Sequence, residues 1–304
     1  MNRSPFDCAQ GDLRWTTTRM DSNRSEHGAQ LREQLVEEGY CVVESVLDAE
    51  MLEAVRAASN ALLDAQDPDH FEKQKSTGSL ICVYDDPWFA ELIAWQPAID
   101  VLATMGYFKP TFSTGFVISK PAHSPPLFWH QDWWGWEHPH SYTPNPQQVF
   151  LMYYLVDTTP ENGCLRLIPR SHLTRHPMHD APEAHTEEIR RAEDLSEPVF
   201  QDLEDEVDVC VTAGDLVIGD SRLLHSARAN TTDQRRTVIT LWYHPIFYEL
   251  PESMQAHLGS RKKGPRQVDE WPAQAQEKIR PLIPVYDGPA EPLNWNRTPG
   301  PALV

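Results

Sequence analysis

The sequence has little cysteine and no long run of apolar residues. Its five cysteines lie far apart and none forms a CxxC pair, which argues against a disulfide framework and favours a reduced, cytoplasmic protein. No stretch approaches the roughly 20 apolar residues that a membrane helix needs. Residues 1–28 are polar and lack the apolar core of a secretory signal, so we interpret them as a disordered leader.

Basic residues are also scarce. The chain has 26 lysines and arginines against 45 aspartates and glutamates, a formal net charge of −19. Nucleic acids and anionic membranes both require a basic surface, so we expect neither as a partner. A chain of 304 residues, 40% of them hydrophobic, suits one large β-barrel or sandwich with added helices.

The expected elements change in type along the chain. Amphipathic periodicity predicts three scaffold helices, over residues 29–39, 48–66 and 87–106. Short apolar runs between Pro- and Gly-rich connections predict strands over residues 40–45, 111–120, 148–157, 164–169, 207–220 and 236–245. Many short strands after a helical start predict one antiparallel domain, over residues 29–250. We expect the proline-rich residues 251–304 to form a tail packed on it.

The segment "PLFWHQDWWGW" (residues 126–136) places two polar side chains in an aromatic setting. On an extended backbone His130 and Asp132 project to the same side, and buried polar groups need partners. Together with His225, which closes an alternating apolar strand, they form a ligand set that suits non-haem Fe(II). A chance origin is also open, because His-x-Asp is a common tripeptide and the chain has 13 histidines.

An arginine pair follows His225 across a turn-like stretch. Arg235 and Arg236 begin the next predicted strand, and a hairpin there would return an arginine toward the metal. A guanidinium can bind a carboxylate through two parallel hydrogen bonds.

Three blocks of the sequence, "WHQD", "ENGCLRLIPRSH" and "AGDLVIGDSRLLHSARANTTDQRRTVITLWY", together resemble the phytanoyl-CoA dioxygenase family of Fe(II)/2-oxoglutarate-dependent oxygenases. The resemblance implies a mainly β fold with flanking helices, a double-stranded β-helix (a jelly roll of the cupin type). It implies His130, Asp132 and His225 as iron ligands. It also implies that Arg236 binds the distal carboxylate of 2-oxoglutarate, while Arg235 faces solvent.

Further contacts follow from the same resemblance. Gln131 matches the middle residue of the family's His-x-Asp motif and is expected to touch the cosubstrate. Thr114 is a second candidate for such a contact, with plain barrel lining as the alternative. The presence of Asp132, where related halogenases carry a small residue, indicates hydroxylation or a related oxidation.

Aromatic and histidine side chains next to the motif are candidates for substrate binding. These candidates are Trp129, Trp133, Trp134 and His138. A cap on the barrel is the alternative role for the tryptophans.

The resulting hypothesis is an oxygenase that uses Fe(II), 2-oxoglutarate and O2 to hydroxylate or otherwise oxidise a small molecule, releasing succinate and CO2. Two alternatives stay open: a cupin-type metal-dependent hydrolase or isomerase, and a non-catalytic small-molecule-binding barrel. The sequence identifies neither the prime substrate nor the oligomeric state.

Overall fold

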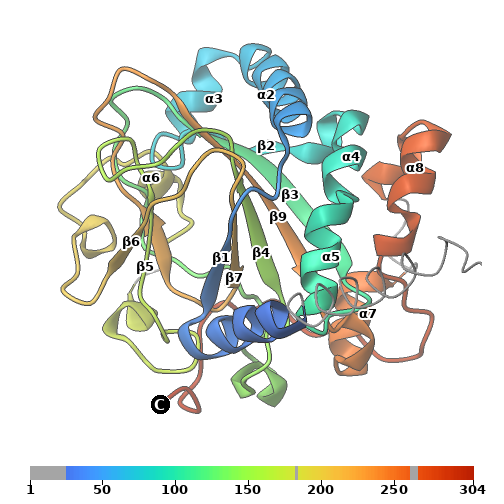
Figure 1. Cartoon of the computed structure of the whole chain (residues 1–304). Coiled ribbons are helices and arrows are strands. Elements are labelled where there is room, and N and C mark those ends of the chain that lie inside the picture. Colours follow the sequence, from blue (N-terminus) through green and yellow to red (C-terminus); the bar gives the residue numbers. More distant parts are fainter. Residues whose placement is uncertain (1–24, 182–183, 261–265) are drawn as a thin grey trace, which may run out of the picture.

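The computed structural model describes residues 25–181, 184–260 and 266–304. Two antiparallel β-sheets pack against each other in it, and helices cover the outer face of the larger sheet (Figure 1). Within the described ranges, the structure contains no helix with the length and apolar character that a membrane crossing requires. The arrangement is that of a jelly roll, as the sequence predicted.

The larger sheet has six strands and the smaller sheet three. In spatial order the larger sheet contains β1 (Tyr40–Val43), β7 (Leu216–Asp220), β4 (Val149–Tyr154), β9 (Arg236–His244), β3 (Thr111–Lys120) and β2 (Ile81–Cys82). The smaller sheet contains β6 (Val207–Val209), β5 (Leu165–Leu167) and β8 (His225–Ala227).

Strand β4 shows why the two sheets enclose a core. All six of its residues are buried. Val149, Leu151 and Tyr153 pack toward the helices. The alternate side chains, Phe150 and Met152, pack between the two sheets. This period of two is what a strand with both faces covered requires.

Helices precede and follow the strands. The described chain begins in a helix over residues 25–38, and the later helices are α2 (Ala49–Asp64), α3 (Pro68–Lys73), α4 (Ala90–Ile93), α5 (Gln96–Thr104), α6 (Glu187–Arg190), α7 (Glu252–Gly259) and α8 (Ala273–Ile279). Asp48 caps α2 because its carboxylate accepts a hydrogen bond from the Met51 N–H at 2.8 Å.

Three expectations need correction. The helix expected over residues 87–106 is interrupted between α4 and α5, where Pro97 lacks the N–H that a continuous helix needs. The strand expected over residues 207–220 is two strands, β6 and β7, which belong to different sheets. Residues 25–28 are helical, and the rest of the expected leader lies outside the described residues. The packed tail expected over residues 251–304 stays a prediction, and within it the chain forms α7 and α8.

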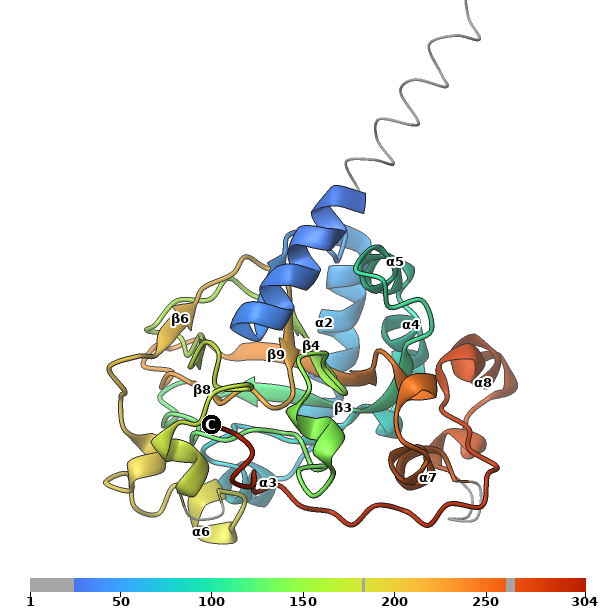
Figure 2. The same cartoon turned by 90° about the horizontal axis from the view of Figure 1, so that it is seen from below.

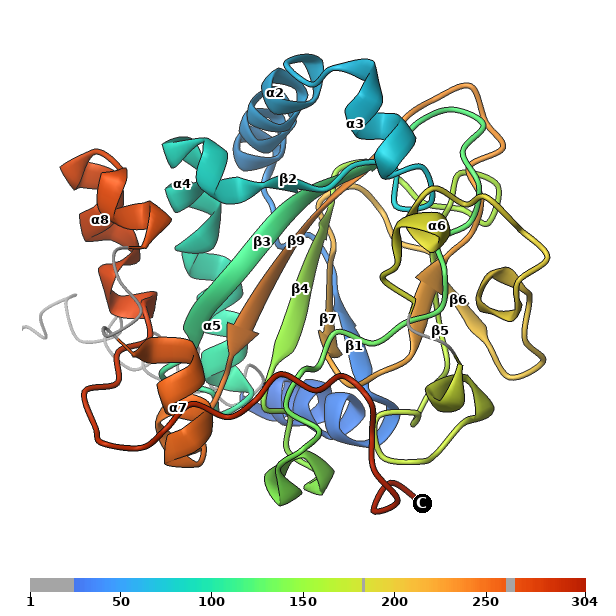
Figure 3. The same ribbon diagram turned by 180° about the vertical axis from the view of Figure 1, so that it is seen from behind.

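The last part of the chain, residues 293–304, is called the C-terminal segment below. It leaves the side of the molecule that carries α7 and crosses to the side that carries α6 (Figure 2 and Figure 3). Its end is fixed there, because the Arg175 N–H donates to the carbonyl of Val304 at 3.1 Å.

Candidate metal centre and pocket

His130 and His225 are held opposite each other by backbone pairing. The His130 N–H donates to the His225 carbonyl at 3.0 Å, and the His225 N–H donates back at 2.9 Å. Residues paired in this way project to the same face. Asp132 lies two residues further along and is fixed by its own N–H, which donates to the Ser221 carbonyl at 2.7 Å.

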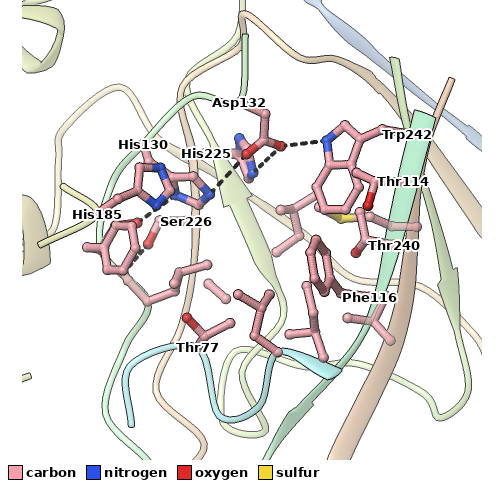
Figure 4. Close-up of a pocket in the computed structure, with 18 of the residues that line it drawn as sticks. Thr77, Thr114, Phe116, His130, Asp132, His185, His225, Ser226, Thr240 and Trp242 are labelled. Carbon is pink, nitrogen blue, oxygen red and sulfur yellow. Dashed lines mark hydrogen bonds and ion pairs between the residues drawn. The ribbon is translucent and has the colours of Figure 1, made fainter. Parts of the chain in front are cut away.

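The three side chains converge on one point. His130 Nε2 lies 3.6 Å from Asp132 Oδ1, and His225 Nε2 lies 3.6 Å from Asp132 Oδ2 (Figure 4). All three potential ligand atoms lie within 4.8 Å of one another, close enough to share one ion. Two imidazole nitrogens and one carboxylate are the donor set of non-haem iron sites, so these residues fit the group.

The outward nitrogens of the two imidazoles are fixed by backbone carbonyls. His130 Nδ1 lies 3.0 Å from the Phe128 carbonyl, and His225 Nδ1 lies 3.0 Å from the Leu223 carbonyl. A carbonyl only accepts, so each Nδ1 carries the proton and each Nε2 keeps its lone pair. Burial, followed by the nearby imidazoles of His225 and His185, holds the pKa of His130 well below its usual value, which favours the neutral form that a metal needs.

Asp132 has a fixed partner that the sequence analysis did not identify. The Trp242 indole N–H donates to Asp132 Oδ2 at 2.9 Å (Figure 4). Trp242 lies six residues after Arg236 on β9 and therefore faces the same side. That even spacing was a signal from which the sequence could have predicted its place in the pocket.

A cavity of about 500 Å³ opens beside these residues. Its floor consists of cross-strand pairs between β3 and β9, namely Thr114 with Trp242, Phe116 with Thr240, Ile118 with Val238, and Lys120 with Arg236. Figure 4 shows the first two pairs facing the metal ligands. The cavity volume lies within the usual range for small-molecule sites, about 300–1,000 Å³.

The adjacent arginines Arg235 and Arg236 have different surroundings. Arg236 is 3% exposed and lines the pocket, and its Nε has no hydrogen-bond partner among the described residues. Arg235 has a 40% exposed side chain, 3.9 Å from a carboxylate oxygen of Asp64. Opposite Arg236, Lys120 Nζ donates a hydrogen bond to the Ser76 carbonyl at 2.9 Å.

The remaining cosubstrate candidates lie apart from each other. Thr114 lines the pocket. The Gln131 side-chain amide instead donates to the Arg297 carbonyl, and Gln131 lines a neighbouring cavity of about 320 Å³ rather than the main one. This hydrogen bond therefore links the metal loop, the segment that carries His130 and Asp132, to the C-terminal segment.

The four substrate candidates are also separated. Trp134 lines the pocket, and Trp129 lines the neighbouring cavity. Trp133 is fully buried and donates to the Ser141 hydroxyl at 2.9 Å. His138 accepts a hydrogen bond from the His140 N–H in a local turn. Trp133 and His138 line neither cavity, so their assignment to the substrate stays a prediction without support from the pocket lining.

Several pocket residues come from loops and from the chain end. His185 stands edge-on to His130, with ring centroids 5.3 Å apart, and its Nε2 is buried without a partner in the described part of the chain. His257, on α7, also lines the pocket, as do Trp295 and Arg297 of the C-terminal segment. These segments carry no periodic pattern, so no sequence signal placed them here.

A comparison with known proteins finds a relative that covers most of the chain. A protein named ectoine dioxygenase from Stutzerimonas stutzeri (strain A1501) is 25% identical over 290 residues, covering 87% of this chain and 89% of its own.

Solved structures share the fold. The non-heme alpha ketoglutarate dependent epimerase SnoN from nogalamycin biosynthesis has a TM-score of 0.55 at 22% identity, covering 72% of this chain and 83% of its own. EctD from S. alaskensis with 2-oxoglutarate and 5-hydroxyectoine has a TM-score of 0.53 at 20% identity, covering 71% of this chain and 75% of its own. These likenesses confirm the double-stranded β-helix.

The family model for phytanoyl-CoA dioxygenase (PhyH) matches residues 35–238, more than half of the chain. The matched range contains the converging histidines and carboxylate and the buried arginine of β9. The chain therefore belongs to the phytanoyl-CoA dioxygenase family of Fe(II)- and 2-oxoglutarate-dependent oxygenases.

Proposed function

We propose that His130, Asp132 and His225 hold Fe(II), and that Arg236 binds the distal carboxylate of 2-oxoglutarate. The observation that carries this proposal is their meeting in one pocket: three ligand atoms within 4.8 Å of one another, and a buried guanidinium whose Nε has no partner among the described residues. A buried charge without a partner is costly, so an anionic ligand that binds at this place explains its presence.

Each residue has a defined task in this proposal. When iron is bound with 2-oxoglutarate and O2, it supplies the oxidising power, with release of succinate and CO2. The Phe128 and Leu223 carbonyls keep the two Nε2 atoms turned toward the metal, and Trp242 keeps the Asp132 carboxylate in place. Lys120 faces Arg236 across the strand pair, where burial, and next the charge of Arg236, hold the pKa of the Lys120 amine well below its usual value.

We propose hydroxylation of a C–H bond in a small metabolite as the reaction. Asp132 occupies the position that a halogenase would leave open for chloride. A relative named ectoine dioxygenase and a neighbour solved with 5-hydroxyectoine support an oxygenation.

The test is an anaerobic titration with Fe(II) and 2-oxoglutarate, followed through the visible charge-transfer band of the chelated cosubstrate. We expect the band in the wild type and its loss in His225→Ala. His172→Ala is the matched control, because His172 is also buried but its Nε2 contacts the Val36 carbonyl, away from the pocket. A band that survives in His225→Ala would refute the ligand set.

The arginine is tested in the same assay. Arg236→Met should raise the 2-oxoglutarate concentration for half-maximal band formation about 30-fold or more, because breaking a buried charge pair costs roughly 2–5 kcal/mol. Arg235→Met is the control and should change this 2-oxoglutarate concentration little. A metal-dependent hydrolase or isomerase would give no 2-oxoglutarate band at all.

We also propose a cytoplasmic location and a small-molecule substrate without a nucleic-acid partner. The described cysteines support the first part because all four are free, namely Cys41, Cys82, Cys164 and Cys210. The net charge of −19 supports the second. Cell fractionation and a nucleic-acid retention assay at low salt test these two parts.

A further inference from the structure

The turn that joins β7 to β8 contacts two of the three proposed metal ligands. This β7–β8 turn comprises residues 220–224 and passes from the larger sheet to the smaller one. The Ser221 carbonyl accepts a hydrogen bond from the Asp132 N–H at 2.7 Å. The Leu223 carbonyl accepts one from His225 Nδ1 at 3.0 Å. One short turn therefore fixes the backbone of the carboxylate ligand and the ring orientation of an imidazole ligand.

A buried ion pair closes this turn. The side chains of Asp220 and Arg222 are each 1% exposed. The Asp220 carboxylate accepts three hydrogen bonds from Arg222, namely from its backbone N–H and its Nε at 2.9 Å each, and from a terminal guanidinium nitrogen at 2.6 Å. A two-pronged contact between a guanidinium and a carboxylate fixes geometry as well as charge. The pair therefore holds the turn in one conformation.

The same guanidinium holds a second segment beside the metal loop. Its other terminal nitrogen donates to the Ser141 and Thr143 carbonyls at 2.7 Å each. The Ser141 hydroxyl in turn accepts from the Trp133 indole N–H at 2.9 Å. Trp133 directly follows Asp132, and its backbone N–H donates to the Ser221 carbonyl at 2.8 Å. The turn and the metal loop are therefore linked twice, through backbone hydrogen bonds and through this guanidinium.

Stability alone is a weak reason for such a pair. Removing two charges from water costs free energy that their attraction roughly offsets, so apolar side chains often serve a fold as well. Neither Asp220 nor Arg222 lines the pocket or the neighbouring cavity, so neither is placed to touch cosubstrate or substrate. What the pair supplies is direction, because its hydrogen bonds determine where the Ser221 and Leu223 carbonyls point.

We propose that the Asp220–Arg222 pair positions the metal centre. By fixing the β7–β8 turn, the pair keeps Asp132 and His225 in the arrangement that binds Fe(II). Both members act through backbone carbonyls and not on substrate, so they are positioning residues. The inference rests on the proposed function, because Asp132 and His225 are ligands in that proposal. It adds that the metal affinity of the folded protein depends on two charges outside the pocket.

The test is an anaerobic titration of the full-length apoprotein with Co(II), followed through the ligand-field absorption bands of the bound ion. Co(II) takes nitrogen and oxygen donors as Fe(II) does, and its bands report the number and geometry of the ligands. Asp220→Asn should weaken Co(II) binding about tenfold and change the bands. Removing an outer partner of a metal ligand costs about 10- to 100-fold in affinity, and Asp220 acts one contact further out, which favours the lower end.

A second variant keeps the test valid if the first fails to fold. Asp220→Asn/Arg222→Gln leaves no unpaired charge in the interior, where such a charge is costly. We expect Co(II) to bind this double variant about tenfold more weakly than the wild type as well. The reason is that the two N–H donors of glutamine cannot replace the five of arginine, so the turn and the Ser141 carbonyl are no longer held together.

Leu63→Ala is the matched control for a loss of stability alone. Leu63 is 1% exposed on α2 and packs in the core on the helical side of the larger sheet. Truncating a buried leucine destabilises a fold, so the midpoint of denaturant unfolding should fall. The Co(II) affinity and the bands of the folded Leu63→Ala protein should stay those of the wild type.

The outcomes separate this inference from the proposed function. A wild type that binds no Co(II) refutes the proposed function. A wild type that binds Co(II), with the folded Asp220 variants within twofold of its affinity and with the same bands, overturns the inference alone. Variants that stay unfolded at saturating Co(II) overturn it too, because the pair then serves the fold as a whole. A fall in affinity no larger than that of Leu63→Ala has the same consequence.

Discussion

Replacing Trp242 by phenylalanine should weaken metal binding without altering any of the three proposed ligands. The Trp242 N–H holds Asp132 Oδ2 at 2.9 Å, and the two carboxylate oxygens each lie 3.6 Å from one Nε2. Without that hydrogen bond the carboxylate is free to rotate away from the position between the imidazoles. Phenylalanine keeps a ring against Phe116, whose centroid lies 5.9 Å from that of Trp242, so the packing changes little.

The expected magnitude follows from the kind of contact that is lost. Removing an outer partner of a metal ligand typically costs about 10- to 100-fold in metal affinity, which corresponds to about 1.4–2.8 kcal/mol. A hydrogen bond to a charged group contributes about 1.5–3 kcal/mol, the same range. The Asp132 side chain is 11% exposed, so water replaces the indole N–H only in part.

The assay is anaerobic titration of the apoprotein with Fe(II) in the presence of saturating 2-oxoglutarate. Trp95→Phe is the matched control, because the Trp95 indole N–H also donates at 2.9 Å, to the Val46 carbonyl remote from the pocket. Trp95→Phe should lower the free energy of unfolding by about 0.5–1.5 kcal/mol and leave metal affinity unchanged. A Trp242→Phe protein that binds Fe(II) within twofold of the wild type would refute the role assigned to this hydrogen bond.

Two further predictions concern stability. Burial lowers the pKa of His244 to about 4, below its value of about 6.5 in the unfolded chain. The folded state is therefore fully stable with respect to this group above pH 6.5. As the pH falls toward 4, the free energy of unfolding should drop by up to about 3 kcal/mol. Denaturant unfolding at pH 7 and pH 5 checks this. His244→Gln should reduce the dependence of the free energy of unfolding on pH, and an unchanged dependence would contradict this role of His244. Gly219→Ala should destabilise the fold by about 1–3 kcal/mol, because the added Cβ would lie 2.0 Å from Phe150 Cζ. Phe150 contacts His225 with ring centroids 5.0 Å apart, so metal affinity should fall as well, which the Fe(II) titration measures.

The sequence predicted the metal-binding segment because local geometry is enough to place it. His130 and Asp132 lie two apart on an extended segment, and that spacing alone puts both on one side. The choice of Arg236 over Arg235 agrees with their burial, since β9 begins at Arg236 and the next residue inward is Val238. Most strands were predicted for the same reason, because a period of two is visible in a single sequence, whereas the short strands β2 and β8 lie outside the expected ranges.

Other features depend on contacts between distant parts of the chain. The run over residues 207–220 has the pattern of one strand, but its two ends pair with different sheets. Trp133 and Trp134 are adjacent and chemically identical, yet one is enclosed in the core and the other lines the pocket. Arg297 lies in a proline-rich stretch without periodicity, so its place depends on tertiary contacts such as the hydrogen bond from the Gln131 amide to its carbonyl.

The difference between the features that the sequence predicts and those that it does not has a physical cause. The floor of the pocket is fixed by β-sheet register, in which Lys120 faces Arg236 and Thr114 faces Trp242, so the fold itself sets which positions face the proposed metal and cosubstrate sites. The opposite wall consists of a loop residue, His185, and of Arg297 in the C-terminal segment. Backbone hydrogen bonds dock that segment, and its side chains can change without disturbing a strand. Relatives of this chain should therefore share Fe(II) and 2-oxoglutarate chemistry while their substrates differ, because the two properties are encoded in separate parts of the structure.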